Sequence, residues 1–482
     1  MRFRSFVIIL ATLALSACSK TSPTASLEPF SAALTRLPDA SLQQLATVPR
    51  YHLSLALNPQ SRSLTGRATV HYTNGAPGEL RELYFRLYPN MRMYGGALAT
   101  TRAIVDGREV PFVEMAKGTD LKVPLPRTLP PGEAVSIVID YTLSYPVSTG
   151  DYDFFGEREG VVILSECYPV LAPLIDGEWR LDASPGYGDA AYADLSLYRL
   201  EITAPAAFTV IAPGTLTDWR SSNDGVVSTF VTGPTRTVGI VAGSGYQAQE
   251  SRTGSVFLTG YSDPADASSM SAALGHAAAM LAFGTESFGP YLSSTLTLVQ
   301  VPLARSDLHL GGLVLINQPY FDERRQEAGS AVALAVSREW WGVQVAFDPL
   351  RDPWLDESLS AYTTYMYLRA GAGEMGTADI VATWEDDYQT AAATGQTSPL
   401  RQPLSAYGNS ARYELLVHSQ GPLFWRDLEH LLGEAGLKAI LRDLQQSAGG
   451  GHCDSADLVQ TIARLVGEPG LKVAESWGLS PP

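Results

Sequence analysis

One stretch of the chain, from Leu334 to Tyr362, constrains the rest because it carries two aromatic landmarks at a fixed separation. The first landmark is Arg338-Glu339-Trp340-Trp341-Gly342, and the second is Trp354-Leu355-Asp356-Glu357-Ser358-Leu359-Ser360-Ala361-Tyr362. Eighteen residues, 339–356, separate position 338 from Glu357. Side chains four residues apart lie on one face of a helix, so positions 334 and 338 would share a face. The residue types at these positions decide what chemistry the stretch supports.

The second landmark resembles the WLNEGxAxY segment of the M1-family zinc aminopeptidases, and Arg338–Gly342 stands where that family has HQWWG or HQWFG. In the family, an HExxH helix supplies two histidine ligands and a general-base glutamate to one zinc ion. The glutamate of the second segment is the third ligand. The resemblance places the HExxH pentad on Leu334-Ala335-Val336-Ser337-Arg338 and the third ligand on Glu357.

The residues at the zinc positions differ from those of the family. Leu334 cannot coordinate a metal, Ala335 cannot accept a proton, and Arg338 keeps a positive charge that repels a cation. Glu357 alone is not a zinc site. The sequence therefore predicts no catalytic residue and no metal ligand, and zinc is expected to be absent.

Further family landmarks follow in order. Phe288-Gly289-Pro290-Tyr291 resembles an FGPYP element, and Gly312–Ile316 resembles the run after the GxMEN strand, which places GxMEN on Ser306–Leu310. His309 then replaces the glutamate that holds the substrate's amino group, and a histidine has no reliable negative charge. Val417–Gly421 resembles the V-Y-x-K-G segment, with His418 in place of the oxyanion-binding tyrosine. The degenerate family site consists of His309, Leu334, Ala335, Arg338, Glu339, Glu357 and His418.

The N-terminus has the form of an export signal. A basic start with Arg2 and Arg4 precedes an apolar run, Phe6–Leu15, that is short for a membrane span. Leu15-Ser16-Ala17-Cys18 resembles the lipobox of bacterial lipoproteins, which implies acyl chains on Cys18 and stable anchoring. A plain secretory signal is the alternative. We expect a lipid-anchored protein of the bacterial cell envelope that faces the periplasm or exterior, and Ser19, not Asp, favours the outer membrane.

Charge excludes one class of partner. The chain has 34 Lys and Arg against 50 Asp and Glu, a net charge of −16, so it offers no basic footprint for nucleic acid. No later segment is long and apolar enough to span a bilayer. Cys167 and Cys453 are expected to be buried thiols, and whether they pair is open.

Alternating short strands predict an all-β region before the helices. The strands expected are 51–57, 64–72, 82–88, 134–145, 195–203, 227–232, 237–242 and 296–302, with an Ala- and Met-rich helix near 265–284 and a helical pair over 423–446. The fold class is α+β and multidomain: residues 1–17 form a signal peptide, 18–45 a lipid-anchored linker, 46–248 an all-β domain like the M1 saddle domain, and 249–482 a mostly helical thermolysin-like (gluzincin) domain expected to be inactive.

Other histidines are assigned no ligand role. His52 and His71 are expected on strands as surface or cross-strand residues, His276 on a packed helix, and His430 and His452 on the surface without partners.

Three functions remain open. The first is a pseudo-peptidase, not an enzyme, that binds a peptide or protein ligand in the former active-site cleft. The second is a purely structural or assembly lipoprotein. The third is a hydrolase with a rearranged site built from His309, Glu339, Glu357 and His418. The family fold also predicts that Arg338 and Glu357 converge and form an ion pair within about 4 Å.

Overall fold

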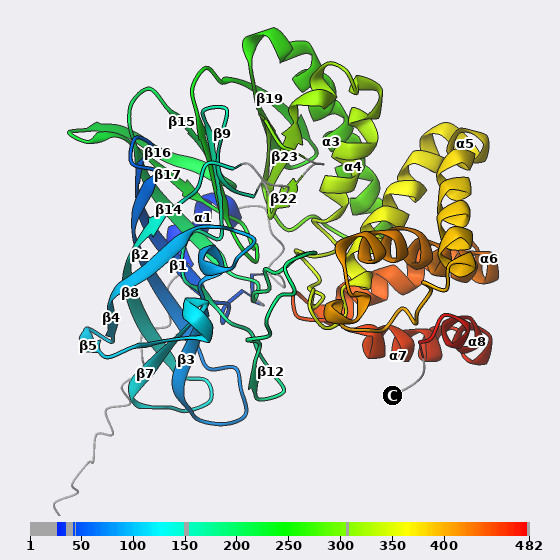
Figure 1. Ribbon diagram of the computed structural model, residues 1–482, viewed down its shortest axis with the longest axis horizontal. Helices are drawn as coiled ribbons and strands as arrows, with labels where there is room; N and C mark the ends of the chain where they lie inside the picture. Colours follow the sequence, from blue (N-terminus) through cyan, green and yellow to red (C-terminus); the bar gives the residue numbers. More distant parts are fainter. Residues whose placement is uncertain (1–26, 35–41, 44, 149–153, 305–307, 480–482) are drawn as a thin grey trace, which may run out of the picture.

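The computed structural model describes residues 27–34, 42–43, 45–148, 154–304 and 308–479. Cys18, Ser306 and Asp307 lie outside the described residues. A β-rich region comes first and a mostly helical region follows, and the two stand side by side (Figure 1). This order confirms the α+β architecture expected from the sequence.

The largest sheet of the described chain has the strand order β16-β17-β14-β1-β2-β8-β4-β5. Its strands are β1 (Arg50–Asn58), β2 (Ser63–Thr73), β4 (Ala97–Val105), β5 (Arg108–Val110), β8 (Ala134–Ser144), β14 (Leu197–Ala204), β16 (Thr215–Ser222) and β17 (Gly225–Val231). The first two expected strands are present and form an antiparallel β1–β2 hairpin. Leu53 and Ala68 face each other on its buried face, while His52 and His71 point outward. The alternation therefore separates a core face from an outer face.

Three smaller sheets complete the β-rich region. One contains β9 (Phe155–Arg158), β10 (Val161–Ser165), β15 (Thr209–Ile211) and β18 (Gly239–Gly243); another contains β3 (Leu80–Arg86), β6 (Val113–Met115), β7 (Asp120–Leu129) and β11 (Val170–Leu171); the third pairs β12 (Leu174–Ile175) with β13 (Glu178–Trp179). A short N-terminal segment, η1 (Glu28–Phe30) and α1 (Ser31–Leu34), packs against β14 and β16 of the large sheet.

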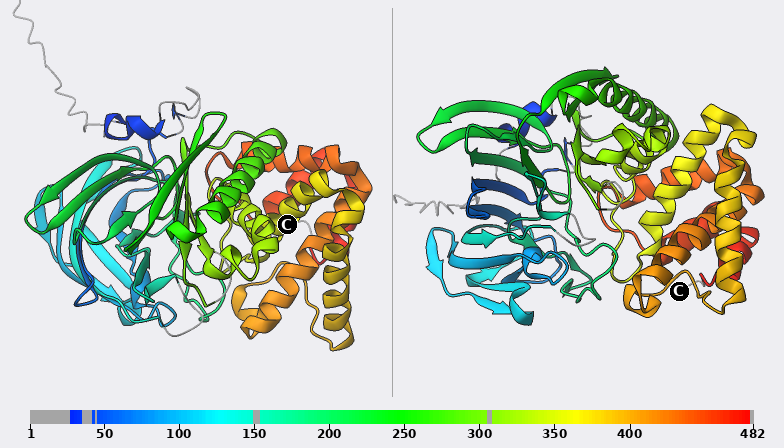
Figure 2. Two further views of the ribbon diagram at one scale, coloured as in Figure 1. Left: turned by 90° about the horizontal axis from the view of Figure 1, so that it is seen from above. Right: turned by 45° about the horizontal axis from the view of Figure 1, so that its top comes forward.

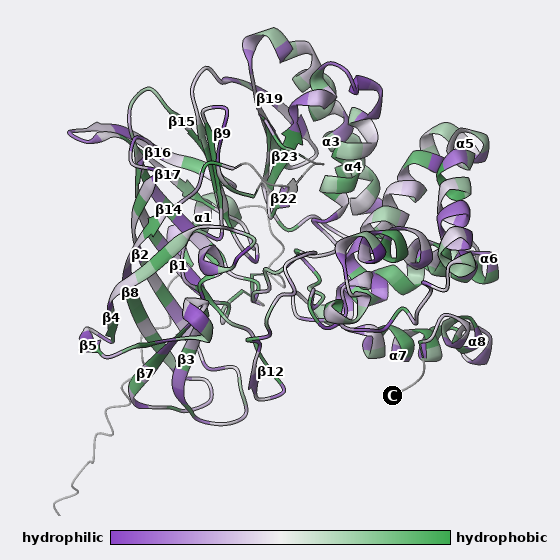
Figure 3. Cartoon of the chain, in the orientation of Figure 1, coloured by the Kyte–Doolittle hydropathy of each residue, from purple (hydrophilic) through white to green (hydrophobic). Residues whose placement is uncertain are grey.

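A five-stranded sheet begins the second region, with the order β19-β20-β21-β23-β22. Its strands are β19 (Gln247–Thr253), β20 (Val256–Ser262), β21 (Thr295–Val301), β22 (Leu308–Leu310) and β23 (Leu313–Asn317). The helix α3 (Ala267–Phe288) covers it and buries Met270, Leu274 and Leu281 at helical spacing. Next comes α4 (Ala328–Ser337), whose apolar residues stand out in Figure 3. The strand β22 lies at the edge of the sheet.

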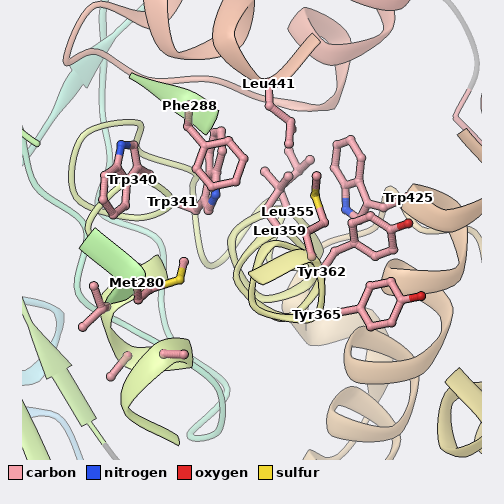
Figure 4. Close-up of a cluster of buried hydrophobic side chains, with 14 of the residues drawn as sticks. Met280, Phe288, Trp340, Trp341, Leu355, Leu359, Tyr362, Tyr365, Trp425 and Leu441 are labelled. Carbon is pink, nitrogen blue, oxygen red and sulfur yellow. The ribbon is translucent and has the colours of Figure 1, made fainter. Parts of the chain in front are cut away.

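The helices α5 (Trp354–Ala393), α6 (Ser410–Ala448), α7 (Ser455–Leu465) and α8 (Glu468–Ser476) form the rest. Figure 4 shows Leu355 and Leu359 of α5 between Phe288 and Trp425 in the buried core. The two long helices approach closely, because a Cβ on Gly421 would lie 2.4 Å from that of Ser358. This approach carries the neighbouring part of α6 up to the start of α5.

No helix among the described residues is both long enough and apolar enough for a bilayer crossing. Cys167 and Cys453 are buried free thiols, as expected.

Candidate functional site

Arg338 and Glu357 meet where α4 ends and α5 begins. Arg338 is the C-cap of α4, and Glu357 lies in the first turn of α5, where the helix dipole favours a carboxylate. The Arg338 Nη2 donates a hydrogen bond of 2.6 Å to the Glu357 Oε2. The predicted ion pair is therefore confirmed, and with it the alignment that placed these two positions side by side.

Charge and burial hold this pair together. The side chain of Arg338 is 26% exposed and that of Glu357 is 9% exposed. Burial disfavours both charges, but the carboxylates of Glu357 and Asp189 outweigh it and raise the pKa of Arg338. Burial likewise opposes ionisation of Glu357, yet the Arg338 charge lowers the pKa of that carboxyl below its ordinary value. Both groups are charged at neutral pH.

Two more carboxyl groups surround the guanidinium. Asp189 lies on the segment that precedes β14, and its Oδ2 is 3.7 Å from the Arg338 Nη1. Asp356 is the neighbour of Glu357 and is partly exposed. Burial and the Glu357 charge raise the pKa of Asp189 and raise the pKa of Asp356 well above its ordinary value. One guanidinium thus faces three acidic groups.

A second buried pair joins the edge strand to the residue after Arg338. The His309 Nε2 on β22 lies 2.6 Å from the Glu339 Oε1, and these side chains are 5% and 3% exposed. The same Glu339 oxygen accepts a 2.7 Å hydrogen bond from the backbone N–H of Gly312. Glu339 therefore orients the imidazole of His309.

These groups surround a cavity of about 570 Å³ between the two regions, which we call the central cavity. Six of the seven residues of the degenerate family site line it: His309, Leu334, Ala335, Arg338, Glu357 and His418. The seventh, Glu339, stands behind His309 and is 2% exposed. His418 reaches the cavity from α6 and is exposed. The residues assigned from the family alignment therefore come together in space.

Several polar residues of the central cavity were not found from the sequence, among them Glu166, Asp189 and Tyr413. Glu166 follows β10 with a φ of 43°, a left-handed conformation that is costly for a residue with a Cβ. Its carboxylate accepts a 3.0 Å hydrogen bond from the Tyr94 hydroxyl, and burial raises its pKa. Burial and the nearby Glu357 charge raise the pKa of Tyr413 well above its ordinary value. Glu166 and Asp189 belong to the β-rich region. No sequence motif in that region indicated that it contributes residues to the cavity.

The donor set at the zinc position does not fit a zinc ion. A catalytic zinc site needs three side-chain ligands, and position 334 offers an alkyl group while position 338 offers a cation. The remaining carboxylate, that of Glu357, is already hydrogen-bonded to Arg338. Across the described ranges, no group of three or more His, Cys, Asp and Glu side chains is placed to hold a metal ion.

Comparison with known proteins gives a fold. No family model matches the chain, and no curated protein matches its sequence. Among solved structures, an M1 zinc metallopeptidase from Deinococcus radiodurans is similar over 90% of this chain and 94% of its own, with a TM-score of 0.67 and 20% identity. A mutant of that protein bound to a Tyr-Ser-Ala substrate is similar over 90% and 95%, with a TM-score of 0.67 and 19% identity.

The expectation that the chain is not an enzyme has to be corrected. The solved structures that match it over 90% of its length are zinc metallopeptidases, so the fold gives no ground for excluding an enzymatic activity. The expectation counted only the substituted positions of the motifs. It left out Glu166, Asp189 and Tyr413, which the β-rich region and α6 bring to the central cavity, and the pairing of His309 with Glu339. The chain has the fold of the M1 zinc metallopeptidases.

Proposed function

We propose that this chain is a lipid-anchored protein of the bacterial cell envelope that binds peptides in its central cavity. The observation that carries the proposal is the cavity itself, which brings a guanidinium, several carboxyl groups and an imidazole together in about 570 Å³. Pockets of about 300–1,000 Å³ with a few convergent polar groups are typical ligand sites. A peptide presents charges and amide groups of both polarities, which suits a lining of this mixture.

The lining offers partners for the different groups of a peptide. Asp189, Asp356 and Glu166 supply oxygens that accept hydrogen bonds from an ammonium group or from amide N–H groups. Arg338 and the Tyr413 hydroxyl supply donors for carbonyl and carboxylate oxygens. Supporting this assignment, a protein with the same fold is bound to a tripeptide, Tyr-Ser-Ala.

The proposal gives Arg338 the place of the metal. Its guanidinium lies against Glu357, which the family resemblance places at the third zinc-ligand position, so the cavity keeps a fixed positive charge beside that carboxylate. A planar guanidinium binds carbonyl or carboxylate oxygens by hydrogen bonds and does not polarise water as a Lewis acid does.

A binding experiment with a blocked cavity tests the proposal. The full chain in neutral detergent is titrated with the tripeptide Tyr-Ser-Ala by calorimetry. Leu334→Trp adds bulk to the cavity lining and is expected to weaken binding at least tenfold, whereas Leu431→Trp on exposed α6 surface is expected to leave it unchanged. Equal binding by both variants, or no saturable binding of peptides by the parent protein, contradicts the proposal.

The anchor is tested separately, through Cys18. Its position after Leu15-Ser16-Ala17 supports acylation, and two or more acyl chains give stable attachment. Cys18→Ser is expected to move the protein from the outer-membrane fraction to the soluble envelope or culture fraction, and to abolish incorporation of labelled fatty acid. Wild-type protein that is recovered in the soluble fraction without detergent would show that the anchor is absent.

A second candidate is hydrolysis of the bound peptide, and the His309–Glu339 pair favours it. A histidine oriented by a buried carboxylate is the usual arrangement of a general base. His309 would take a proton from water as the water oxygen bonds to the peptide carbonyl carbon. It would then return that proton to the amine nitrogen as the C–N bond breaks.

Peptide cleavage measured in the presence of a metal chelator tests this candidate. His309→Gln is expected to lower cleavage at least a hundredfold, a loss within the range for removal of a general base. The matched change His430→Gln, on the exposed side of α6, is expected to have no effect. Cleavage that survives His309→Gln would reject His309 as the base.

A further inference from the structure

A second cavity lies on the outer face of the large sheet, and none of the described residues lines both it and the central cavity. Its volume is about 1070 Å³. One wall is the N-terminal segment with η1 and α1, and the other is formed by β1, β2 and β8. In Figure 2 this segment lies against the outside of the large sheet, away from the long helices. We call this space the N-terminal cavity.

Arg50 is a buried cation that lines the N-terminal cavity and has no counter-ion among the described residues. Its residue surface is 5% exposed, and no carboxylate of the described chain lies within ion-pair distance of it. The Nη2 donates to the backbone oxygens of Ala46 at 2.8 Å and Leu45 at 3.5 Å. The Nε is buried and has no hydrogen-bond partner among the described residues. A buried charge is costly unless it is paired and hydrogen-bonded, so Arg50 has unused capacity for an anion.

A second buried arginine without a carboxylate partner among the described residues, Arg236, gives a contrast to Arg50. Arg236 is also buried, at 6% exposure. Its Nε, Nη1 and Nη2 donate to five backbone oxygens, at Ala193, Val343, Gln344, Gly450 and Gly451. The backbone thus satisfies all three nitrogens of Arg236. For Arg50 it satisfies only one.

Two histidines stand beside Arg50 on the same wall. His71 of β2 is the cross-strand partner of Arg50, and His52 of β1 is the partner of Arg199 on β14. Burial and the Arg50 charge lower the pKa of His71, and burial and the Arg199 charge lower the pKa of His52. Opposite charges next to a histidine would raise its pKa. These histidines therefore lie in a positive local field.

The other arginines that line the cavity have acidic neighbours of their own. Arg127 pairs with Glu133 at 2.6 Å, and Arg199 lies 3.9 Å from Glu201. The acidic side chains that line the cavity are Glu28 and Asp106, and the latter accepts a 3.0 Å hydrogen bond from the Ser136 N–H. Apolar side chains adjoin the positive end, namely Phe30, Val48, Val135 and Val231.

We propose that the N-terminal cavity binds an anionic amphiphile, whose phosphate or carboxylate group pairs with Arg50 and His71 and whose apolar part lies against Phe30 and Val231. The site gives His71 a ligand role where the sequence predicted only a surface position. It is independent of the central cavity. The ligand's charged group is that of an acidic lipid headgroup or of a free amphiphile in the envelope.

Three probes distinguish the contribution of the ligand's charged group to binding from that of its apolar part. The full chain in neutral detergent is titrated with dihexanoyl phosphatidate, with dihexanoyl phosphatidylcholine, and with inorganic phosphate, while the ring signals of His52 and His71 are followed by NMR. Phosphatidate is expected to bind at one saturable site and shift the His71 signal. Inorganic phosphate is expected to cause the same shift at least tenfold more weakly. Phosphatidylcholine that shifts the signal equally would overturn the proposal.

Variants of matched type complete the test. Arg50→Gln is expected to weaken phosphatidate binding at least tenfold, whereas Arg67→Gln is expected to leave it unchanged. Arg67 lies on the same face of β2, is 55% exposed and pairs with Asp140. If Arg50→Gln does not fold, His71→Gln at the exposed neighbour carries the test, with a loss of threefold or more. The proposal is overturned if the Arg50 variant, or the His71 variant that takes its place, binds phosphatidate as tightly as the Arg67 variant does. Vesicles of phosphatidylglycerol, offered in place of dispersed lipid, tell a membrane headgroup from a free amphiphile.

Discussion

The His452 Nε2 lies 2.7 Å from the Asp194 Oδ1, and this contact joins the loop after α6 to the segment that precedes β14. The two residues are 258 positions apart. The ring of Tyr192 stands edge-on to His452 at 4.9 Å between centroids. The expectation that His452 is a surface residue without a partner is therefore wrong, because its partner belongs to the β-rich region. Together with Arg236, this contact ties the two regions at one end of the central cavity.

Arg236→Met is expected to lower the free energy of unfolding by on the order of 3–5 kcal/mol. The change removes a buried cation and leaves five backbone oxygens without their donor. Urea denaturation of the full chain measures the loss. Arg351→Met is the control, because Arg351 forms an ion pair with Asp182 at 3.0 Å on the surface, and such pairs contribute about 0–1 kcal/mol. Equal losses in the two variants would show that Arg236 is not a clamp between the regions.

The parts of the structure that were predictable are those that short-range spacing or the family resemblance determines. The β1–β2 hairpin follows from the alternation of apolar residues on both sides of a short turn, and the two strands pair antiparallel. The Arg338–Glu357 pair was expected from the resemblance to the M1 family, whose fold brings these two motif positions together.

The parts that were missed depend on contacts between distant segments. Asp189 and Glu166 enter the central cavity from the β-rich region, and neither lies in a motif that marks this position. His452 and Arg236 find their partners across the boundary between regions. The helices α5 and α6 are kinked at Gly373, with a φ of 72°, and at Gly433, with a φ of 71°. Each kink requires a glycine, but most glycines of the chain lie at no kink, so a glycine alone does not predict one. Composition and periodicity carry no signal for any of these.

The Arg338–Glu357 pair is expected to stabilise the fold. Arg338→Met leaves the Glu357 carboxylate at 9% exposure without its cation, at a cost of about 2–4 kcal/mol. The double variant with Glu357→Gln is expected to recover at least about 1 kcal/mol of that loss, because it removes the unpaired charge. A double-mutant cycle by urea denaturation gives the coupling energy. The Arg426–Glu385 pair on the surface, analysed in the same way, should give less than about 1 kcal/mol. A coupling no larger than in this control would mean that solvent screens the buried pair.

Restoring the family pentad is expected to restore metal binding. Leu334→His, Ala335→Glu and Arg338→His together provide two imidazoles on the face of α4 and release Glu357 from its cation. The triple variant should hold about one zinc per chain by metal analysis after dialysis, whereas the parent should hold much less. The partial change Leu334→His alone is the control, since Arg338 still neutralises Glu357. Stoichiometric zinc in the parent protein would contradict this reading of the site.

Asp352 is expected to make stability depend on pH between about 4 and 6. Its Oδ2 accepts a 2.6 Å hydrogen bond from the Ser455 N–H, but its Oδ1 is buried without a partner among the described residues, and the residue is 4% exposed. Burial raises the pKa of Asp352 from 3.8 to about 6. Between these values the folded chain binds more protons at this site than the unfolded chain, so the site's contribution to stability falls as pH rises and levels off above about pH 6.

The change Asp352→Asn isolates this contribution. The free energy of unfolding of the parent, minus that of the variant, should fall by about 2–3 kcal/mol from pH 4 to pH 7, a value that follows from about 1.4 kcal/mol for each unit of pKa shift. Urea denaturation at four pH values measures it. Asp379→Asn, at an exposed position of α5, should show no such slope. A difference that is flat with pH would mean that Asp352 ionises in the folded chain as it does in the unfolded one. A difference that rises with pH would mean that the hydrogen bond from Ser455 outweighs burial and stabilises the ionised carboxylate.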